Sequence, residues 1–252
     1  MSKIVFITGA TAGFGKADAI KFAQNGWNCI ISGRRKERLD SLAKELEEKY
    51  KVEVLPLEID VQSRTDVFDK IGAIPEKWQN IDVLINNAGL ALGTENFEDA
   101  DLDNWDTMID TNVKGLLYVS KAIIPFFIAH KKGHIINMTS TAAKDVYPGG
   151  NIYCATKHAV DAITKAQRIE LLKYGIKVTA IAPGAADTEF SQVRFKGDTS
   201  KADKVYTGYE PLHAEDIADT IFYCANLPKH VCINDLVITC TAQANAFFFD
   251  KK

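Results

Sequence analysis

Short apolar runs alternate with longer amphipathic stretches along the whole chain. Each apolar run predicts a strand, at residues 4–7, 28–32, 52–59, 81–85, 134–138, 176–181 and 235–239. Between the runs, apolar residues recur at helical spacing, in residues 17–25, 36–50, 102–129, 153–174 and 213–225. Strands that alternate with helices pair in parallel, so the pattern predicts one α/β domain with a parallel sheet over residues 1–252.

The first predicted strand runs into a glycine-rich turn. Thr8-Gly9 is followed by Gly13 and Gly15, and a helical pattern begins soon after. Glycines let the backbone approach a pyrophosphate, and a helix N-terminus offers free N–H groups and the positive end of its dipole. The alternative is a tight turn that binds nothing. The density of glycines favours a phosphate site, made by Gly9, Ala10, Thr11, Ala12, Gly13, Phe14 and Gly15.

The second predicted strand ends at Ser32-Gly33-Arg34-Arg35. In dinucleotide-binding folds an acid in this region binds the ribose 2′-hydroxyl of NAD. Here two guanidiniums stand instead, and arginine suits a 2′-phosphate. Arg34 and Arg35 therefore favour NADP over NAD. The alternative is a pair of solvated charges, but cations are not stabilised at the helix N-terminus that follows.

Polar residues follow three further strands. Asp60-Val61, Asn87 and Ser140 stand at positions that are carboxyl ends of predicted strands, where open α/β sheets bind ligands. We expect Asp60, Val61 and Asn87 to contact the cofactor. Two interpretations of Asp60 remain open: its carboxylate accepts from the adenine amino group, or it caps the next helix.

Asn112 falls inside the apolar stripe of the helix predicted at residues 102–129. A buried amide needs hydrogen-bond partners. Either Asn112 is a satisfied core residue that bends the helix, or it holds an internal water near a site. The spacing alone does not decide between these two interpretations.

Tyr153 and Lys157 stand four residues apart on a predicted helix, which places them on one face. A lysine ammonium near a phenol lowers the pKa of the phenol, so the pair is a candidate for acid–base chemistry. Chance alone produces this spacing in many chains. The other motifs must therefore supply its meaning.

The composition excludes several classes of protein. The net charge of -3 and pI of about 6.0 give no basic excess for binding nucleic acid. No apolar run reaches the roughly 18 residues of a membrane span, and the strand pattern begins too early for a signal or transit peptide. The 5 cysteines are scattered without a C-x-x-C pair, which predicts a reduced, cytoplasmic protein. No His cluster has metal-ligand spacing.

Taken in order, the motifs resemble the short-chain dehydrogenase/reductase family over nearly the whole chain. They are T-G-x-x-x-G-x-G from Thr8, Asn86-Asn87-Ala88-Gly89, Asn112, Ser140, Tyr153-x-x-x-Lys157 and Pro183-Gly184-x-x-x-Thr188. The resemblance implies a Rossmann-like, doubly wound sheet of seven parallel strands and a homotetramer. It also implies a catalytic tetrad of Asn112, Ser140, Tyr153 and Lys157, and cofactor contacts from Tyr153, Lys157, Pro183, Gly184 and Thr188.

A closer resemblance is to NADP-dependent 3-hydroxy acid dehydrogenases, which also oxidise L-serine and L-allo-threonine and reduce malonic semialdehyde. It is carried by TGATAGFG, GRR, NNAGLALG, MIDTNVKG and TEFSQVRFKGD. The last of these lies in a polar segment, residues 188–212, that we expect to form a lid. Ala185-Ala186, Lys144-Asp145-Val146 and Cys154 depart from the pattern. The alternatives are a reductase of 3-oxoacyl groups or other carbonyls, and a dinucleotide-binding regulator without turnover.

The resemblance gives the tetrad its roles. Tyr153 takes the alcohol proton, Ser140 holds the substrate oxygen, Lys157 binds the nicotinamide ribose and Asn112 positions a water. Two positive charges, one on Lys157 and one on the oxidised nicotinamide, would each lower the pKa of Tyr153 by about two units at an effective dielectric near 20.

An acid substrate needs a cation for its carboxylate. Arg194, in the predicted lid, is the first candidate because guanidinium binds carboxylate through two hydrogen bonds. Lys196 is the second, and a solvated lid charge is the alternative for both. The terminal Phe247-Phe248-Phe249 is apolar enough to predict a subunit contact.

Overall fold

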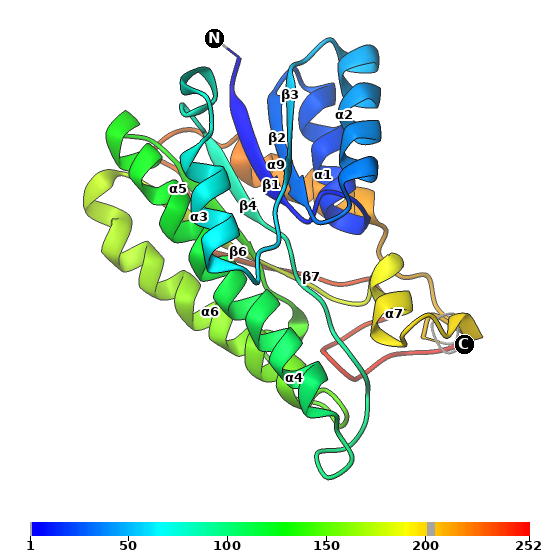
Figure 1. The fold of residues 1–252 in the computed structure, drawn as a ribbon. Coiled ribbons are helices and arrows are strands. Elements are labelled where there is room, and N and C mark those ends of the chain that lie inside the picture. The colour runs from blue at the N-terminus through cyan, green and yellow to red at the C-terminus, as the bar shows by residue number, and fades with distance from the viewer. Residues whose placement is uncertain (1, 201–204) are drawn as a thin grey trace.

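The computed structural model describes residues 2–200 and 205–252. Within them, a seven-stranded parallel sheet forms in the order β3-β2-β1-β4-β5-β6-β7 (Figure 1). Its strands are β1 Ile4–Thr8, β2 Asn28–Gly33, β3 Val54–Glu58, β4 Val83–Asn86, β5 His134–Met138, β6 Lys177–Pro183 and β7 Asp235–Ile238. The predicted α/β fold is confirmed, and the strand bounds differ from the predicted ones by at most two residues.

Helices cover both faces of the sheet. On one face lie α1 Gly13–Gln24, α2 Lys36–Tyr50 and α9 Ala214–Ala225, and on the other lie α3 Arg64–Gly72, α4 Leu102–Ile109, α5 Leu116–His130 and α6 Asn151–Leu171. Short 3-10 turns occur at η1 Glu76–Trp78, η3 Thr141–Ala143 and η4 Leu172–Tyr174. The short helix α7, Glu189–Arg194, stands apart from both layers in Figure 1.

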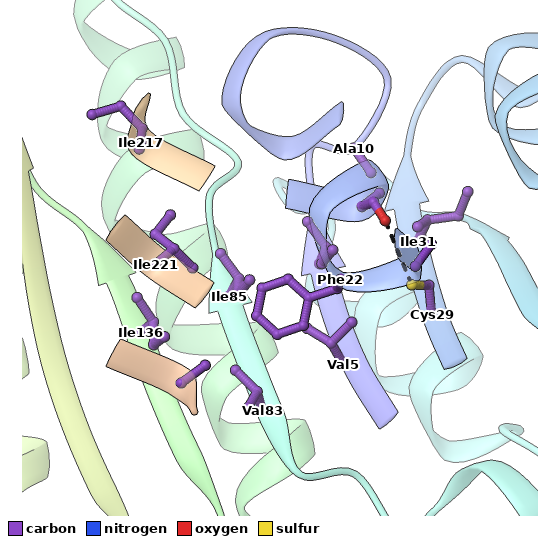
Figure 2. Packing of buried hydrophobic residues seen from close by; sticks show 14 of the residues in the cluster. Val5, Ala10, Phe22, Cys29, Ile31, Val83, Ile85, Ile136, Ile217 and Ile221 are labelled. Atoms are coloured by element: carbon purple, nitrogen blue, oxygen red, sulfur yellow. Dashed lines mark hydrogen bonds between the residues drawn. The ribbon is translucent and has the colours of Figure 1, made fainter. Parts of the chain in front are cut away.

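The central strands are buried on both faces. In β1, Val5 and Ile7 point into the core under α1 and α9, whereas Ile4 and Phe6 point into the core under α3 and α5. Figure 2 shows the ring of Phe22 from α1 beside Val5 of β1 and within the same cluster as the neighbouring strands. Such two-sided burial explains why these strands read as continuous apolar runs.

The strand order reverses next to β1. The chain moves outward from β1 to β2 and β3, and then returns to place β4 on the other side of β1. The loops after β1 and β4 therefore diverge and leave a crevice at the carboxyl ends of the strands. Ligands of doubly wound sheets bind at this position.

The helix predicted over residues 102–129 is not regular. It consists of α4, a π-helical segment η2 at Asp110–Gly115, and α5. A π-helical turn contains an extra residue per turn. Gly115 closes this segment where a Cβ would lie only 2.9 Å from Cγ2 of Val61, so the helix passes unusually close to the loop after β3.

The stretch Leu102–His130 is long and apolar enough to cross a membrane by length and composition alone. The stretch is not an uninterrupted apolar run, because it contains Asp110, Lys114 and Lys121. In the fold, however, this stretch is one layer of the domain: Val119, Ile123 and Phe127 are buried in the core beneath the sheet. A core helix of this kind meets the same criteria.

Candidate active site

A cavity of about 660 Å³ opens at the carboxyl ends of the strands. Pockets of this size hold small molecules and cofactors. Most of the residues predicted for the site line it: Gly9, Thr11, Ala12, Gly13, Phe14, Arg34, Arg35, Asp60, Val61, Asn87, Ser140, Tyr153, Lys157, Pro183, Gly184, Thr188 and Arg194. Three others lie behind the wall: Ala10 and Asn112 are buried, and Gly15 packs against the turn itself.

The glycine turn has the shape that a pyrophosphate requires. Gly9 and Gly13 have φ values of 69° and 51°, in the left-handed region that favours glycine. A Cβ on Gly15 would lie 2.5 Å from the carbonyl oxygen of Gly9. Ala12, at the N-cap of α1, makes no side-chain hydrogen bond to the helix, so the first N–H groups of α1 are open to an anion. The cradle therefore fits a dinucleotide phosphate.

Asn87 holds the end of β4 against this turn. Its Nδ2 donates to the carbonyl oxygen of Thr8 at 2.8 Å. In return, Oγ1 of Thr8 accepts from the backbone N–H groups of Asn87 and Ala88, at 3.0 and 2.9 Å. These bonds fix the spacing between two walls of the cavity.

Arg35 stands at the far end of the cavity, where the adenosine side of a dinucleotide would lie. Its Nε and Nη2 donate to Oγ1 of Thr11 at 3.0 and 2.6 Å, and its Nη1 donates to Glu189 at 3.2 Å. Arg34 also lines the cavity, while its side chain is exposed. Arg35 is exposed as well, but its hydrogen bonds hold it at the cavity rim.

Asp60 does not cap the helix that follows it. The N-cap of α3 is Ser63, whose hydroxyl accepts from the backbone N–H of Asp66. Asp60 instead accepts from the backbone N–H of Gln62 at 3.1 Å and faces the cavity. Of the two interpretations, the structure removes the helix cap and leaves the adenine contact.

Tyr153 and Lys157 lie one turn apart on α6, with Nζ of Lys157 5.8 Å from the ring centre of Tyr153. Nζ of Lys157 donates to the carbonyl oxygen of Met138, at the end of β5, at 2.9 Å. Burial lowers the pKa of Lys157 to about 8. Ser140 begins the turn after β5, where its hydroxyl accepts from the backbone N–H of Ala142 at 3.1 Å.

Burial, followed by the neighbouring phenol of Tyr147, raises the pKa of Tyr153 well above its usual value. Ser140 and Arg194 oppose this rise without cancelling it. The predicted fall depended on two charges, that of Lys157 and that of the oxidised nicotinamide. Lys157 alone does not offset the cost of taking a phenolate out of water, and the pKa of Tyr153 in the complex with the cofactor stays a prediction. In the protein itself Tyr153 is therefore held in its neutral, proton-bearing form.

Asn112 lies in the π-helical segment η2. Its Oδ1 accepts from the backbone N–H of Leu90 and its Nδ2 donates to the carbonyl oxygen of Leu90, both at 2.8 Å. Nδ2 also donates to Oγ1 of Thr156 on α6 at 3.1 Å. The side chain thus matches the interpretation of a satisfied core amide, which ties η2, α6 and the loop after β4 together. Its proposed water stays a prediction.

The described part of the predicted lid, residues 188–200 and 205–212, contains α7; residues 201–204 lie outside the described residues. Thr188 caps α7 through its hydroxyl, which accepts from the backbone N–H of Phe190. Arg194 ends α7 with its guanidinium carbon 5.8 Å from the ring centres of both Tyr147 and Tyr153. Lys196, the second candidate, lies 3.6 Å from a carboxylate oxygen of Asp101.

Arg194 also ties α7 to the loop after β4. Its backbone carbonyl accepts from the N–H of Gly93 at 3.0 Å, and its Nε donates to the carbonyl of Gly93 at 3.3 Å. Its Nη2 donates to the hydroxyl of Tyr147 at 3.4 Å. The arrangement places one cation beside the phenol that would exchange a proton with the substrate.

Comparison with known proteins identifies the family. A model of the family described as short chain dehydrogenase matches residues 3–199. The chain belongs to this family. Its members are oxidoreductases, and the glycine turn, Ser140, Tyr153 and Lys157 of this chain all line the same cavity.

Three relatives of this short-chain dehydrogenase are similar over nearly their full length. Sulfoacetaldehyde reductase 2 of Chromohalobacter salexigens is 46% identical and aligns over 100% of both chains. NADP-dependent 3-hydroxy acid dehydrogenase YdfG of Salmonella typhi is 45% identical over 96% of this chain and 97% of the relative. A solved structure of the closed form of serine dehydrogenase with NADP+ superposes with a TM-score of 0.92, at 42% identity over 99% of each chain.

Several residues of the cavity wall were missed by the sequence argument. Tyr147 lies in the loop before α6, directly before the turn Pro148-Gly149-Gly150. Oε1 of Gln243 accepts from the backbone N–H of Ala185 at 2.8 Å, and the hydroxyl of Tyr206 donates to the carbonyl of Ala186 at 2.6 Å. Tyr147 had a usable signal in that turn, whereas nothing near Gln243 or Tyr206 in the sequence points to the site.

The C-terminal segment of this short-chain dehydrogenase folds back over the cavity. Phe249 packs on Tyr209 with ring centres 5.0 Å apart and lines the cavity. Phe247 and Phe248 are exposed. The predicted subunit contact therefore involves at most these two of the three rings, and it stays a prediction.

Proposed function

We propose that this short-chain dehydrogenase uses NADP to interconvert an alcohol and a carbonyl on a short acid, with one carbon between the reacting carbon and the anionic group. The substrates proposed are 3-hydroxypropionate and malonic semialdehyde, L-serine, L-allo-threonine and, as the sulfonate counterpart, sulfoacetaldehyde. The observation that carries the proposal is the Arg194 guanidinium beside the Tyr153 phenol.

The charge of Arg194 has no carboxylate partner among the ion pairs of the described residues. Its Nε and Nη2 donate to neutral oxygens of Gly93 and Tyr147. A half-buried guanidinium without an anion favours binding one. The distance between Arg194 and Tyr153 suits a substrate whose anion and reacting oxygen are separated by a short carbon chain.

The names of the relatives support this substrate class. A 3-hydroxy acid carries its hydroxyl one carbon away from the carbon that bears the carboxylate, and serine shares that arrangement. In sulfoacetaldehyde the carbonyl carbon is separated from the sulfonate by one CH₂ group. Carboxylate and sulfonate are both flat or tripod oxyanions that a guanidinium binds. One pocket with Arg194 at its end therefore suits both kinds of acid.

The residues of this chain then act as follows. The cofactor would supply a hydride as NADPH in the reduction and accept one as NADP+ in the oxidation. Ser140 holds the reacting oxygen, and Tyr153 exchanges a proton with it. Because burial raises the pKa of Tyr153, its phenol carries a proton that it can donate to the carbonyl oxygen during reduction, and it takes the proton back from the alcohol during oxidation. Lys157, held on the carbonyl of Met138, keeps a cation one turn away from Tyr153.

The NADP assignment is supported by Arg34 and Arg35 at the cavity rim, the absence of an acid after β2, and the named cofactor of the relatives. Assembly as a homotetramer is proposed from the family resemblance, and a cytoplasmic location is proposed from the scattered, free cysteines. Light scattering on the purified protein tests the first, and microscopy of a tagged chain in its own cell tests the second.

A substrate panel assayed with both NADP and NAD tests the proposal. It pairs 3-hydroxypropionate with its neutral amide, and adds L-serine, L-allo-threonine and 2-hydroxyethanesulfonate. We expect the acids to exceed the amide by at least about tenfold in kcat/KM, since a charged hydrogen bond contributes roughly 1.5–3 kcal/mol. Equal turnover of acid and amide would reject the anionic substrate and favour the alternative, a reductase of 3-oxoacyl groups or other carbonyls.

A further inference from the structure

One acidic side chain of α7 forms hydrogen bonds with two arginines, Arg35 at the rim of the cavity and Arg38 on α2. Glu189, the first residue of α7, accepts from Nη1 of Arg35 at 3.2 Å. Both of its carboxylate oxygens also accept from Nη1 of Arg38 on α2, at 3.1 Å. An acid contributed by the lid therefore occupies guanidinium groups at the end of the cavity where the ribose of the cofactor would lie.

The hydrogen bonds of Arg35 leave little room for a second anion. Its Nε and Nη2 are directed at Thr11, and its Nη1 is directed at Glu189. A phosphate binds arginine most strongly through two parallel N–H groups. Three of the five N–H groups of Arg35 serve Thr11 and Glu189, and one N–H remains on each of Nη1 and Nη2. A 2′-phosphate that bound these two would share Nη1 with the carboxylate of Glu189, and the two like charges would repel each other.

Glu189 has a second partner that would retain it. Arg38 contacts both carboxylate oxygens, so Glu189 keeps an ion pair when it gives up Arg35. Arg35 and Arg38 also lower the pKa of Glu189 by more than its partial burial raises it, so the carboxylate is charged. Glu189 therefore stays paired and charged when another anion binds Arg35.

We infer that Glu189 sets the discrimination between NADP and NAD by competing with the 2′-phosphate for Arg35. This inference rests on the proposed role of Arg35 as a ligand of that phosphate. NAD carries a hydroxyl at this position and does not compete. Glu189 weakens NADP binding and leaves NAD binding nearly unchanged, and so it moderates the preference that the arginines create.

The first test removes the charge of Glu189 and keeps its shape. Glu189→Gln and a control, Glu45→Gln, are compared with the parent protein; Glu45 is exposed on α2. Fluorescence titration gives Kd for NADP and for NAD at low and high salt. We expect Glu189→Gln to lower Kd for NADP about threefold to tenfold, as befits an exposed charge pair. Kd for NAD should stay within about twofold, and the gain should shrink in high salt.

The control variant should match the parent protein in all titrations. If Glu189→Gln leaves the ratio of the two Kd values unchanged, Glu189 does not compete with the phosphate. If it weakens NADP binding, the carboxylate holds Arg35 in place instead of competing with the cofactor. Either result overturns the inference.

A second variant separates this inference from the assignment on which it rests. Arg35→Ala should raise Kd for NADP about tenfold to a hundredfold with little effect on NAD, and adding Glu189→Gln to it should have less than about a twofold effect. If Arg35→Ala leaves the ratio of the Kd values unchanged, the assignment of Arg35 fails. If Arg35→Ala lowers the preference and Glu189→Gln does not raise it, only the inference about Glu189 fails.

Discussion

The two walls of the cavity are built in different ways. The cofactor wall consists of turns that leave strands β1, β2 and β4, and close backbone packing at Gly9 and Gly15 fixes its shape. The substrate wall consists of α7, the loop after β4 and the C-terminal segment. Side-chain contacts join these parts: Arg194 to Gly93, and Gln243 to Ala185.

The cofactor wall therefore has a fixed shape, whereas the substrate wall can change. A wall of backbone turns on a buried sheet keeps one geometry, as a shared cofactor requires. A wall that is joined by single hydrogen bonds changes when one side chain changes, and it is where relatives with different named substrates can diverge. Tyr153 lies at the junction, since its hydroxyl end meets the cavity and its ring packs on Phe190 of α7, with ring centres 5.7 Å apart.

Replacement of Tyr153 by Phe should have the largest effect, because the junction serves both walls. We expect kcat to fall by about 10²–10⁴ or more, the usual contribution of a positioned acid or base. Kd for NADP should stay within about threefold, since the glycine turn and the arginines of the cofactor wall are unchanged. Steady-state kinetics measures kcat, and fluorescence titration measures Kd for NADP. Tyr174→Phe, at a partly exposed position away from the cavity, is the matched control, and near-normal activity of Tyr153→Phe would remove Tyr153 from its role.

Replacement of Arg194 by Ala should affect only the substrate wall. We expect KM for acid substrates to rise about tenfold to a hundredfold, because a charged hydrogen bond contributes roughly 1.5–3 kcal/mol. Kd for NADP should not change. Arg194→Lys keeps the charge without the paired N–H groups, so its KM for acid substrates should lie between those of the parent protein and Arg194→Ala. Lys196→Ala is the control, because Lys196 pairs with Asp101. An unchanged KM for acids in Arg194→Ala would show that the substrate anion binds elsewhere.

Replacement of Tyr206 by Phe should give a smaller change in the same wall. The hydroxyl of Tyr206 lies 2.6 Å from Oγ of Ser191 on α7 and donates to the carbonyl of Ala186. Each such bond contributes about 0.5–1.5 kcal/mol. We therefore expect KM to rise about threefold to tenfold, with Kd for NADP unchanged. An equal change in NADP affinity would show that α7 and the cofactor wall move together, which would break the distinction between the walls.

The same contrast explains what the sequence predicts. The cofactor wall follows from local signals, namely an apolar run, a glycine turn and a helix, and the strands lie within two residues of their predicted bounds. The contacts of the substrate wall join residues far apart in the chain, such as Gly93 and Arg194. Gln243 follows β7 with no local motif, so its bond to Ala185 could not be predicted.

Two further differences have physical reasons. The π-helical segment Asp110–Gly115 was not predicted, because one extra residue per turn hardly alters an apolar stripe. The rise in the pKa of Tyr153 in the protein alone could not be predicted, because its burial depends on α7 and on Tyr147, which only the fold brings to the ring. Local spacing thus placed Tyr153 and Lys157 on one helix face, whereas the surroundings of the phenol depended on the fold.

Replacement of Asp18 should have the smallest effect on turnover. Asp18 lies in α1, the helix that follows the glycine turn. Its side chain in α1 is completely buried, and neither oxygen has a hydrogen-bond partner among the described residues. Burial raises the pKa of Asp18 well above its usual value. The folded protein therefore binds a proton that the unfolded chain releases at lower pH, so the free energy of unfolding falls as pH rises from about 4 through the folded pKa.

Asp18→Asn removes this ionisation and keeps the size of the side chain. We expect it to raise the free energy of unfolding at pH 7 by about 1–3 kcal/mol, and Tm by about 2–4 °C for each kcal/mol. The gain should vanish at about pH 4, where the unfolded carboxyl is also largely protonated. Thermal unfolding over a pH series measures it, with the exposed Asp69→Asn as control. An equal gain in the free energy of unfolding at every pH would show that the effect comes from packing and not from ionisation of Asp18. The value of kcat/KM should not change, because Asp18 lies outside both walls.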